Sequence, residues 1–274
     1  MKQFYVTGDK HGIITIDKDL HQDPNAAVII LGDAGFNFYL GKKDQKLKTY
    51  VSEHSKCTWY VVRGNHEARA QDVPNMKEIY DEDVSGLVYI EDGFDKIRYF
   101  KDWGIYTISG YSVAVIGGAY SVDKWYRLTN AGVTNKLDPK YLNPKVTGWF
   151  PNEQLSTKEM CQVETDLGGK SFDFVLTHTC PISWEPTDVF QPVVDQSTVD
   201  KSMEIWLDEL KSKINWGIWL WAHYHVDRIE RPHCEIYYND FEKLDVIYKR
   251  WIDYDNTGKL EDWWLPKSPM FYAK

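Results

Sequence analysis

The sequence has 274 residues, of which 43% are hydrophobic, and a formal net charge of −9. These values are typical of a globular protein with a substantial core, and the negative charge argues against nucleic-acid binding through a broad basic surface. No stretch reaches the ~18 uninterrupted apolar residues of a membrane span, and the first residues lack an export signal, so we expect a soluble, cytoplasmic protein with no membrane partner.

Seven short apolar runs predict β-strands. Each run is rich in β-branched and aromatic residues and is short enough to be a strand buried on both faces. In chain order, the runs are residues 4–7, 27–31, 58–62, 104–108, 113–118, 172–178 and 216–223. Beyond Val226, the segments 229–240 and 244–255 predict further strands, with a turn at 255–258.

Helical patterns lie between these runs. Residues 41–55 are amphipathic, residues 156–167 open with an S-x-x-E capping box, and residues 198–213 have helical apolar spacing. Because strand and helix alternate, the sequence predicts an α/β layered fold. We expect a single domain over residues 1–274.

One segment, residues 119–151, stands apart. It is rich in Tyr, Trp, Asn and Pro and lacks strong periodicity. Long irregular segments in compact domains are usually functional or disordered, and the aromatic content favours an ordered, functional insert. Because the insert follows a buried run directly, we expect its first residues to reach the same edge as the other strand ends.

Five of the apolar runs end in side chains that can bind a metal ion. In chain order, these side chains are Asp9 and His11, Asp33, Asn65 with His66 and Glu67, His178, and His223 with His225. A single such ending is more often an ordinary polar turn, whereas five together indicate a shared site at the carboxyl ends of the strands. Four widely spaced cysteines form no C-x-x-C pair and are expected to be free thiols.

The types of ligand narrow the choice of metal. Carboxylate, imidazole and amide oxygen together suit Mn, Fe, Zn, Co or Ni better than calcium, which prefers shells of oxygen alone. So many ligands exceed one tetrahedral site. Two ions roughly 3.5–4 Å apart, bridged by one carboxylate, would use them and would favour hydrolysis of phosphate esters.

The five endings read "GDKHG", "LGDAG", "RGNHE", "LTHTCP" and "WAHYH" in chain order. In order and spacing, they resemble the motifs of the calcineurin-like metallophosphoesterases, which run D-x-H, G-D-x-x-D, G-N-H-[ED], H and G-H-x-H. The resemblance covers residues 9–225. It implies a layered α/β/β/α sandwich and a phosphomonoesterase or phosphodiesterase with two divalent metal ions.

The resemblance also implies roles for individual residues. One metal would be held by Asp9, His11 and His225, the other by Asn65, His178 and His223, with Asp33 bridging the two. A metal-bound hydroxide would attack phosphorus in line, and the unligated His66 would assist the leaving group. Glu67 is either a residue that steadies a histidine or an ordinary surface carboxylate.

The sequence departs from the family pattern at two positions. Gly35-Phe36-Asn37 fills the space where the second aspartate of G-D-x-x-D is expected, and Ala222 replaces a glycine. The protein phosphatases of the family carry D-R-G at the first position, so a phosphate-binding arginine must come from elsewhere. Arg69 and Arg127 are the candidates, and Tyr120 offers a flat surface for a base or an aromatic leaving group.

Two other readings compete with a phosphoesterase of small molecules or nucleotides. One is a non-catalytic scaffold of the same fold, although such relatives tend to lose ligands and this chain keeps them all. The other is a Ser/Thr protein phosphatase, which the absence of D-R-G weakens. The expected substrate is therefore a phosphorylated small molecule, a nucleotide or a phosphoprotein, and the acidic charge argues against nucleic acid.

Overall fold

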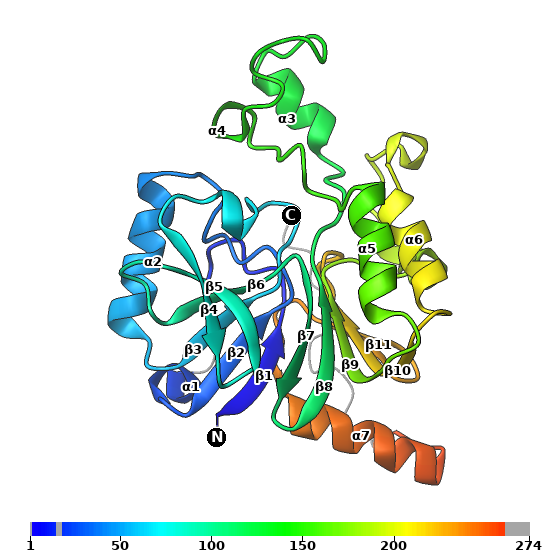
Figure 1. Ribbon diagram of the computed structural model, residues 1–274. Helices are drawn as coiled ribbons and strands as arrows, with labels where there is room; N and C mark the ends of the chain where they lie inside the picture. Colours follow the sequence, from blue (N-terminus) through cyan, green and yellow to red (C-terminus); the bar gives the residue numbers. More distant parts are fainter. Residues whose placement is uncertain (1, 15–17, 261–274) are drawn as a thin grey trace.

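The computed structural model describes residues 2–14 and 18–260. Two β-sheets pack face to face at its centre, and helices cover both outer faces (Figure 1). This arrangement confirms the predicted α/β/β/α sandwich. An apolar core lies between the two sheets, and one further core lies between each sheet and its helices.

The first sheet has seven strands. In spatial order they are β13 (Glu242–Lys243), β1 (Gln3–Thr7), β2 (Ala26–Ile30), β3 (Thr58–Val61), β6 (Ile97–Phe100), β5 (Gly86–Glu91) and β4 (Met76–Asp81). The central strands β1, β2, β3 and β6 run parallel, whereas β13, β5 and β4 are antiparallel to their neighbours. All five residues of β2 are buried, as expected for a strand covered on both faces.

The second sheet has six strands. In spatial order they are β11 (Arg228–Arg231), β12 (Cys234–Ile236), β10 (Asn215–Trp221), β9 (Ser171–Thr177), β8 (Tyr111–Ile116) and β7 (Trp103–Ile108). Strands β8, β9, β10 and β12 are parallel. Each sheet therefore has a group of parallel strands whose carboxyl ends share one edge, where polar side chains from different strands can meet.

Four helices cover the outer faces of the sheets. Helices α1 (Lys18–Gln22) and α2 (Lys42–His54) pack on the first sheet, and α5 (Thr157–Leu167) and α6 (Ser202–Leu210) pack on the second. The predicted capping box at the start of α5 is present, because Ser156 and Glu159 each accept a hydrogen bond from the other's backbone N–H. Four short 3₁₀ turns complete the connections, at Ala70–Asp72, Ile182–Trp184, Thr187–Val189 and Gln196–Thr198.

The predicted strand at 244–255 is wrong. These residues form helix α7 (Leu244–Thr257), which lies at the opposite end of the molecule from the insert (Figure 1). Leu244, Ile247 and Trp251 are buried in the core between the sheets, with the i, i+3, i+7 spacing of a helix. Gly258 then ends the helix in a left-handed conformation. The strands at 229–240 are present as β11 and β12.

The insert at 119–151 contains two short helices, α3 (Lys124–Asn130) and α4 (Pro144–Thr147), and projects above the two sheets in Figure 1. Leu128, Tyr141 and Trp149 form a small apolar core of its own. The segment is therefore ordered by side-chain packing rather than by pairing with a sheet.

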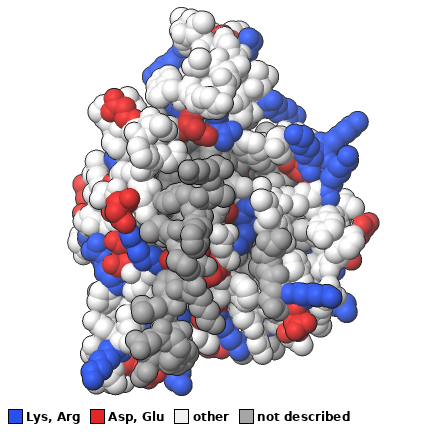
Figure 2. Space-filling view, turned by 180° about the vertical axis from the view of Figure 1, so that it is seen from behind, with Lys and Arg blue, Asp and Glu red and all other residues white. Residues whose placement is uncertain are grey.

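Charged side chains of both signs share the molecular surface. On the face shown in Figure 2, Lys and Arg lie in small groups among Asp and Glu. The four cysteines are unpaired, as expected. Within residues 2–14 and 18–260, the helices are too short or too polar to cross a bilayer.

Candidate metal centre

The polar strand ends of both sheets meet at one edge. Asp9 and His11 follow β1, Asp33 follows β2, Asn65 and His66 follow β3, His178 follows β9, and His223 and His225 follow β10. Residues that lie more than 200 positions apart in the sequence are thereby brought into contact, because β1 and β10 end side by side across the sandwich. The structure places all seven expected ligands in this cluster.

The first group of the cluster joins Asp9, His11 and His225. Their candidate ligand atoms all lie within 4.8 Å of one another. The Nε2 atoms of His11 and His225 are 3.1 Å apart, and each lies within 3.9 Å of Asp9 Oδ1. Two imidazoles and a carboxylate that converge in this way can hold one divalent ion.

The second group lies deeper. His178 Nε2 is 2.9 Å from Asn65 Oδ1 and 3.5 Å from Asp33 Oδ2, and the His223 ring lies 5.0 Å from the His178 ring. Asp33 Oδ2 is also 4.0 Å from His11 Nε2 of the first group. A single carboxylate oxygen of Asp33 therefore lies between the two groups.

The backbone at these strand ends is in an uncommon conformation. Positive φ angles occur at five of the seven expected ligands, namely Asp9 (41°), His11 (45°), Asp33 (51°), His223 (67°) and His225 (53°). Residues other than glycine rarely adopt this region, and such strain tends to collect at functional sites because the surroundings must hold it in place. In the first of these turns the alternate residues Asp9 and His11 enter the cluster, whereas Lys10 between them donates to the Tyr238 carbonyl.

Two glycines allow this close approach. A Cβ atom on Gly32 would lie 2.1 Å from His178 Nδ1, and one on Gly64 would lie 2.0 Å from Asp33 Oδ1. These distances are far below any real contact, so both positions require glycine. The glycines of "LGDAG" and "RGNHE" thus make room for the groups that bind.

The cluster suits a cation. Both carboxylate oxygens of Asp9 are buried and lack a hydrogen-bond partner among the described residues. Burial raises the pKa of Asp9 to about 8, although the nearby His178 acts in the opposite direction. Such a group is costly to bury unless a positive charge lies beside it, and a divalent ion between Asp9 and the imidazoles would supply that charge.

Neighbouring groups fix the orientation of the inner ligands. The Nδ1 atom of His178 is 2.7 Å from the Leu31 carbonyl oxygen, which directs Nε2 toward the cluster. The Asn65 side-chain amide donates to Ser121 Oγ (2.9 Å), which leaves Oδ1 free to coordinate, and Ser121 in turn donates to Glu153 (2.5 Å). Ser121 and Glu153 carry no motif, so sequence reasoning missed them.

Glu67 is a supporting residue rather than a surface carboxylate. It is 3% exposed, and its two oxygens accept from the backbone N–H groups of Gly35 (3.0 Å) and Gly64 (3.3 Å). Burial raises the pKa of Glu67 to about 8. The residue ties together the turns that carry Asp33 and Asn65.

A cavity of about 390 Å³ opens onto the cluster. His66 and Arg127 line it, and both, together with His11, also line a second cavity of about 380 Å³. The backbone N–H of His66 donates to Asp33 Oδ1 (2.8 Å), whereas its Nδ1 has no partner within the described part of the chain. The His66 side chain therefore borders the cavity beside the ligands and is held through its backbone.

Arg127 lies on α3 of the insert. Its Nε donates to Asp123 (2.7 Å), its Nη1 donates to the Gly148 carbonyl (3.2 Å), and its guanidinium lies over the Phe38 ring. No protein partner is recorded for Nη2 among the described residues, and the side chain is 23% exposed. The structure thus brings Arg127 to the cavity with capacity to bind an anion.

Tyr120 reaches the cavity wall but shows little surface. It is 5% exposed, and its hydroxyl lies 3.4 Å from the Thr198 carbonyl oxygen. It also borders a larger cavity of about 1070 Å³, which Arg69 and Glu159 line as well. Tyr120 therefore lines both cavities but exposes little of its side chain to either.

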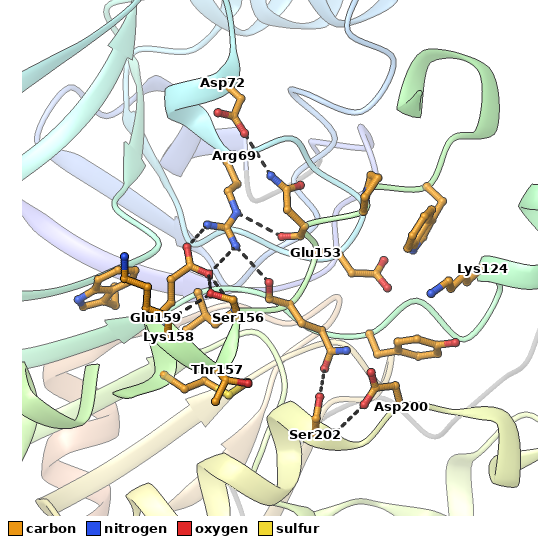
Figure 3. A pocket seen from close by; sticks show the side chains of 18 of the residues that line it. Arg69, Asp72, Lys124, Glu153, Ser156, Thr157, Lys158, Glu159, Asp200 and Ser202 are labelled. Carbon is orange, nitrogen blue, oxygen red and sulfur yellow. Dashed lines mark hydrogen bonds and ion pairs between the residues drawn. The ribbon is translucent and has the colours of Figure 1, made fainter. Parts of the chain in front are cut away.

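The structure does not bring Arg69 to the cluster. Arg69 lines the larger cavity instead, where it contacts Glu159 (Figure 3). It also lies 3.0 Å from Asp102. Its Nε and Nη2 also donate to the carbonyls of Asn152 (3.2 Å) and Gln154 (3.1 Å). Its donors are already used, so Arg69 joins the "RGNHE" turn to α5 rather than binding phosphate.

The remaining wall of the metal cavity comes from residues 185–204, which no motif had singled out. This wall has both apolar and polar side chains. Its apolar residues are Val189, Phe190, Val194 and Val199, and its polar residues are Glu185, Gln191, Gln196, Lys201 and the buried Glu204 of α6. The only sequence signal was a glutamate beside the apolar face of a predicted helix.

Comparison with known proteins identifies the family of the chain. The family model described as calcineurin-like phosphoesterase matches residues 3–227. None of the curated proteins matches the sequence. Among solved structures, the chain is similar to phosphopantetheinyl hydrolase (PptH) from Mycobacterium tuberculosis, with 12% identity, a TM-score of 0.39 and coverage of 86% of this chain and 88% of that chain. Because the family match spans most of the chain and every strand end of the cluster, the protein belongs to the calcineurin-like phosphoesterases, whose reaction is metal-dependent hydrolysis of phosphate esters.

Proposed function

We propose that the protein is a dinuclear metal-dependent hydrolase of phosphate esters. The observation that carries the proposal is the position of Asp33 Oδ2, which lies 4.0 Å from His11 Nε2 and 3.5 Å from His178 Nε2. A carboxylate between two groups of ligands is the arrangement that a pair of cations requires. Family membership supports the chemistry, and this geometry supports the number of ions.

The ligands divide between two ions according to their neighbours. Asp9, His11 and His225 would hold the outer ion, Asn65, His178 and His223 would hold the inner ion, and Asp33 would bridge them. Imidazole, carboxylate and amide donors suit Mn, Fe, Zn, Co or Ni, and manganese is the first metal to test. When bound, the two cations would lower the pKa of a water molecule and neutralise charge on the phosphoryl oxygens.

The protein's own side chains would position the ester. His66 borders the cavity beside the ligands, where it can give a proton or a hydrogen bond to the leaving-group oxygen. Arg127 reaches the same space from the insert and would bind a phosphate oxygen, in the role that D-R-G fills in the protein phosphatases. The substrate would be a phosphorylated small molecule, a nucleotide or a phosphoprotein.

The test is hydrolysis of p-nitrophenyl phosphate and bis(p-nitrophenyl) phosphate by chelator-treated protein to which Mn²⁺ is returned. We expect no activity after chelation and recovery with the metal. Asp33→Asn should lose most of its metal and activity, because a neutral amide cannot hold two cations at the same spacing. Asp95→Asn, at an exposed position before β6, is the matched control.

Two results would count against the proposal. If Asp33→Asn keeps its metal and its activity, the bridge is wrongly assigned. If metal-loaded wild-type protein hydrolyses neither ester under any of the five metals, the non-catalytic scaffold becomes the better account.

A further inference from the structure

A chain of hydrogen bonds joins one of the inner ligands to a buried carboxyl group. The side-chain amide of Asn65 donates to Ser121 Oγ (2.9 Å), and the Ser121 hydroxyl donates to Glu153 Oε2 (2.5 Å). The backbone N–H of Ser121 donates to the other carboxylate oxygen, Oε1 (3.1 Å). All three residues are at most 3% exposed, so bulk water has little access to these bonds. Glu153 therefore accepts from both hydrogen-bond donors of Ser121.

The side-chain amide of an asparagine can lie in two orientations of nearly the same shape. In the structure, Asn65 Oδ1 is 2.9 Å from His178 Nε2, on the side of the metal cluster, and Nδ2 faces Ser121. Half a turn of the amide would exchange the oxygen and the nitrogen. Because the amide nitrogen is a donor only, it cannot bind a cation. Only the observed orientation of Asn65 therefore provides a metal ligand.

The Ser121 hydroxyl selects between the two orientations because it has a single proton. Glu153 accepts that proton, so Ser121 Oγ has only lone pairs left for Asn65. These lone pairs attract the amide nitrogen and repel the amide oxygen. A hydrogen bond to an ionised carboxylate is roughly twice as strong as one between neutral groups, so the serine proton stays with Glu153.

The backbone of Glu153 is fixed independently of its side chain. Its carbonyl accepts from Arg63 Nη1 (2.6 Å), and Arg63 Nε donates to Asp102 (2.5 Å). The Arg63 carbonyl accepts from the Gly118 N–H (2.7 Å), and a Cβ atom on Gly118 would lie 2.6 Å from the Glu153 carbonyl oxygen. The ends of β3 and β8 thus hold Glu153 in place, and its carboxyl lines the larger cavity (Figure 3).

We propose that Glu153 is a positioning residue of the metal centre, which acts through Ser121 to turn Asn65 Oδ1 toward the inner ion. The inference rests on the proposed function, because it requires a cation beside Asn65. Glu153 contacts neither the ions nor the substrate in this account. Its effect should therefore appear in the affinity for one of the two ions.

The experiment measures Mn²⁺ binding to chelator-treated protein by equilibrium dialysis at pH 8. Burial raises the pKa of Glu153 to about 7, so its carboxyl is ionised at this pH. In Glu153→Gln, the new amide can donate to Ser121 Oγ, which frees the serine proton for Asn65 Oδ1 and reverses the chain of hydrogen bonds. We expect this variant to bind one of the two ions at least tenfold more weakly. Glu82→Gln, in the exposed turn between β4 and β5, is the control and should bind both ions as the wild type does.

Two further variants separate the orientation of Asn65 from the charge of Glu153. Ser121→Ala removes the link but keeps the carboxylate, and it should also weaken one ion about tenfold. In Asn65→Asp, an oxygen faces the cluster whichever way the side chain lies, so adding Glu153→Gln should weaken binding by less than threefold. Urea unfolding of the metal-free proteins shows whether each variant is folded. Ser121→Ala removes a single oxygen atom and decides the result if Glu153→Gln does not fold.

The outcomes separate this inference from the proposed function. Wild-type protein that binds fewer than two Mn²⁺ ions contradicts the dinuclear centre itself. If the wild type binds two ions and affinity changes less than threefold in folded Glu153→Gln or in Ser121→Ala, the positioning role alone is overturned. A loss of threefold or more when Glu153→Gln is added to Asn65→Asp also overturns it, because the carboxylate would then act through its charge.

Discussion

His66 lies next to the expected ligand Asn65 in the sequence but has a different role. It borders the metal cavity, and its backbone rather than its side chain contacts Asp33. We predict that His66→Asn keeps both metals and lowers kcat by ~10²-fold or more, because a positioned proton donor contributes ~10² to 10⁴. Metal stoichiometry and kcat should be measured on the same sample. Loss of metal together with activity would show that the imidazole is a ligand.

The two arginines considered for phosphate binding should behave differently. Arg127→Ala should reduce kcat/KM by about tenfold, equivalent to roughly 1.4 kcal/mol, with metal content unchanged. Phe38, over which the guanidinium lies, is unchanged in this variant. The decrease in kcat/KM therefore measures the contribution of the guanidinium charge. If kcat/KM is unchanged on every active substrate, the insert covers the site without binding phosphate.

Arg69→Ala should instead destabilise the fold. Its side chain is 10% exposed and holds Glu159, Asp102 and two backbone carbonyls. Breaking one partner of a buried pair costs roughly 3 kcal/mol, at the lower end of the usual range because Asp102 keeps its contact with Arg63. Urea unfolding measures this change. If the variant has normal stability but has lost its activity, Arg69 acts in phosphate binding and the structural role is wrong.

At the scale of the elements, glycine turns control the spacing of the strand ends. Gly64→Ala should lose metal and activity, because the added Cβ would lie 2.0 Å from Asp33 Oδ1. Gly41→Ala is the matched control, since its nearest heavy atom would be 3.7 Å away, at the start of α2. Full metal occupancy in Gly64→Ala would mean that the turn can shift without disturbing the ligands.

The elements also show which signals the sequence carries. All seven apolar runs became strands because burial on both faces leaves an uninterrupted local pattern. Four strands of the first sheet were not predicted. The partly exposed residues of β4 and β5 break any apolar run, and β6 and β13 are only four and two residues long. Helix α7 was mistaken for a strand because its many aromatic and β-branched residues outweighed its helical spacing.

The site residues differ in the same way, because some lie in local sequence motifs and others do not. The seven expected ligands lie in short motifs at strand ends, so their grouping could be predicted from local sequence. Arg69 and Glu204 could not be judged in this way. The partners of Arg69 lie as far away in the sequence as Glu159. The environment of Glu204 depends on Thr179 and on the segment 185–199, which lines the cavity. Such roles depend on packing that no local pattern describes.

At the scale of the whole molecule, buried carboxyls should make stability depend on pH. Burial raises the pKa of Glu204 from its ordinary 4.5 to about 7. Between these values, the unfolded chain loses its proton before the folded protein does, so stability falls as pH rises through this window and is level above it. Glu204 contributes at most roughly 3 kcal/mol to this fall.

Glu204→Gln should therefore make the free energy of unfolding depend less on pH. Chemical unfolding of metal-free protein at pH 5 and pH 8 measures it, with Glu209→Gln as the exposed control. The difference in unfolding free energy between the two pH values should be smaller in Glu204→Gln than in wild type. Equal slopes in both proteins would show that Glu204 titrates normally.

The central claim is that two metal ions at the joined strand ends make this protein a phosphoesterase. The most direct measurement titrates metal-free protein with Mn²⁺ and follows bound metal and hydrolysis of the nitrophenyl esters in the same sample. We predict that activity rises with occupancy and levels off at two ions per chain. Activity that is unaffected by metal removal, or two bound ions without hydrolysis of either ester, would contradict the account.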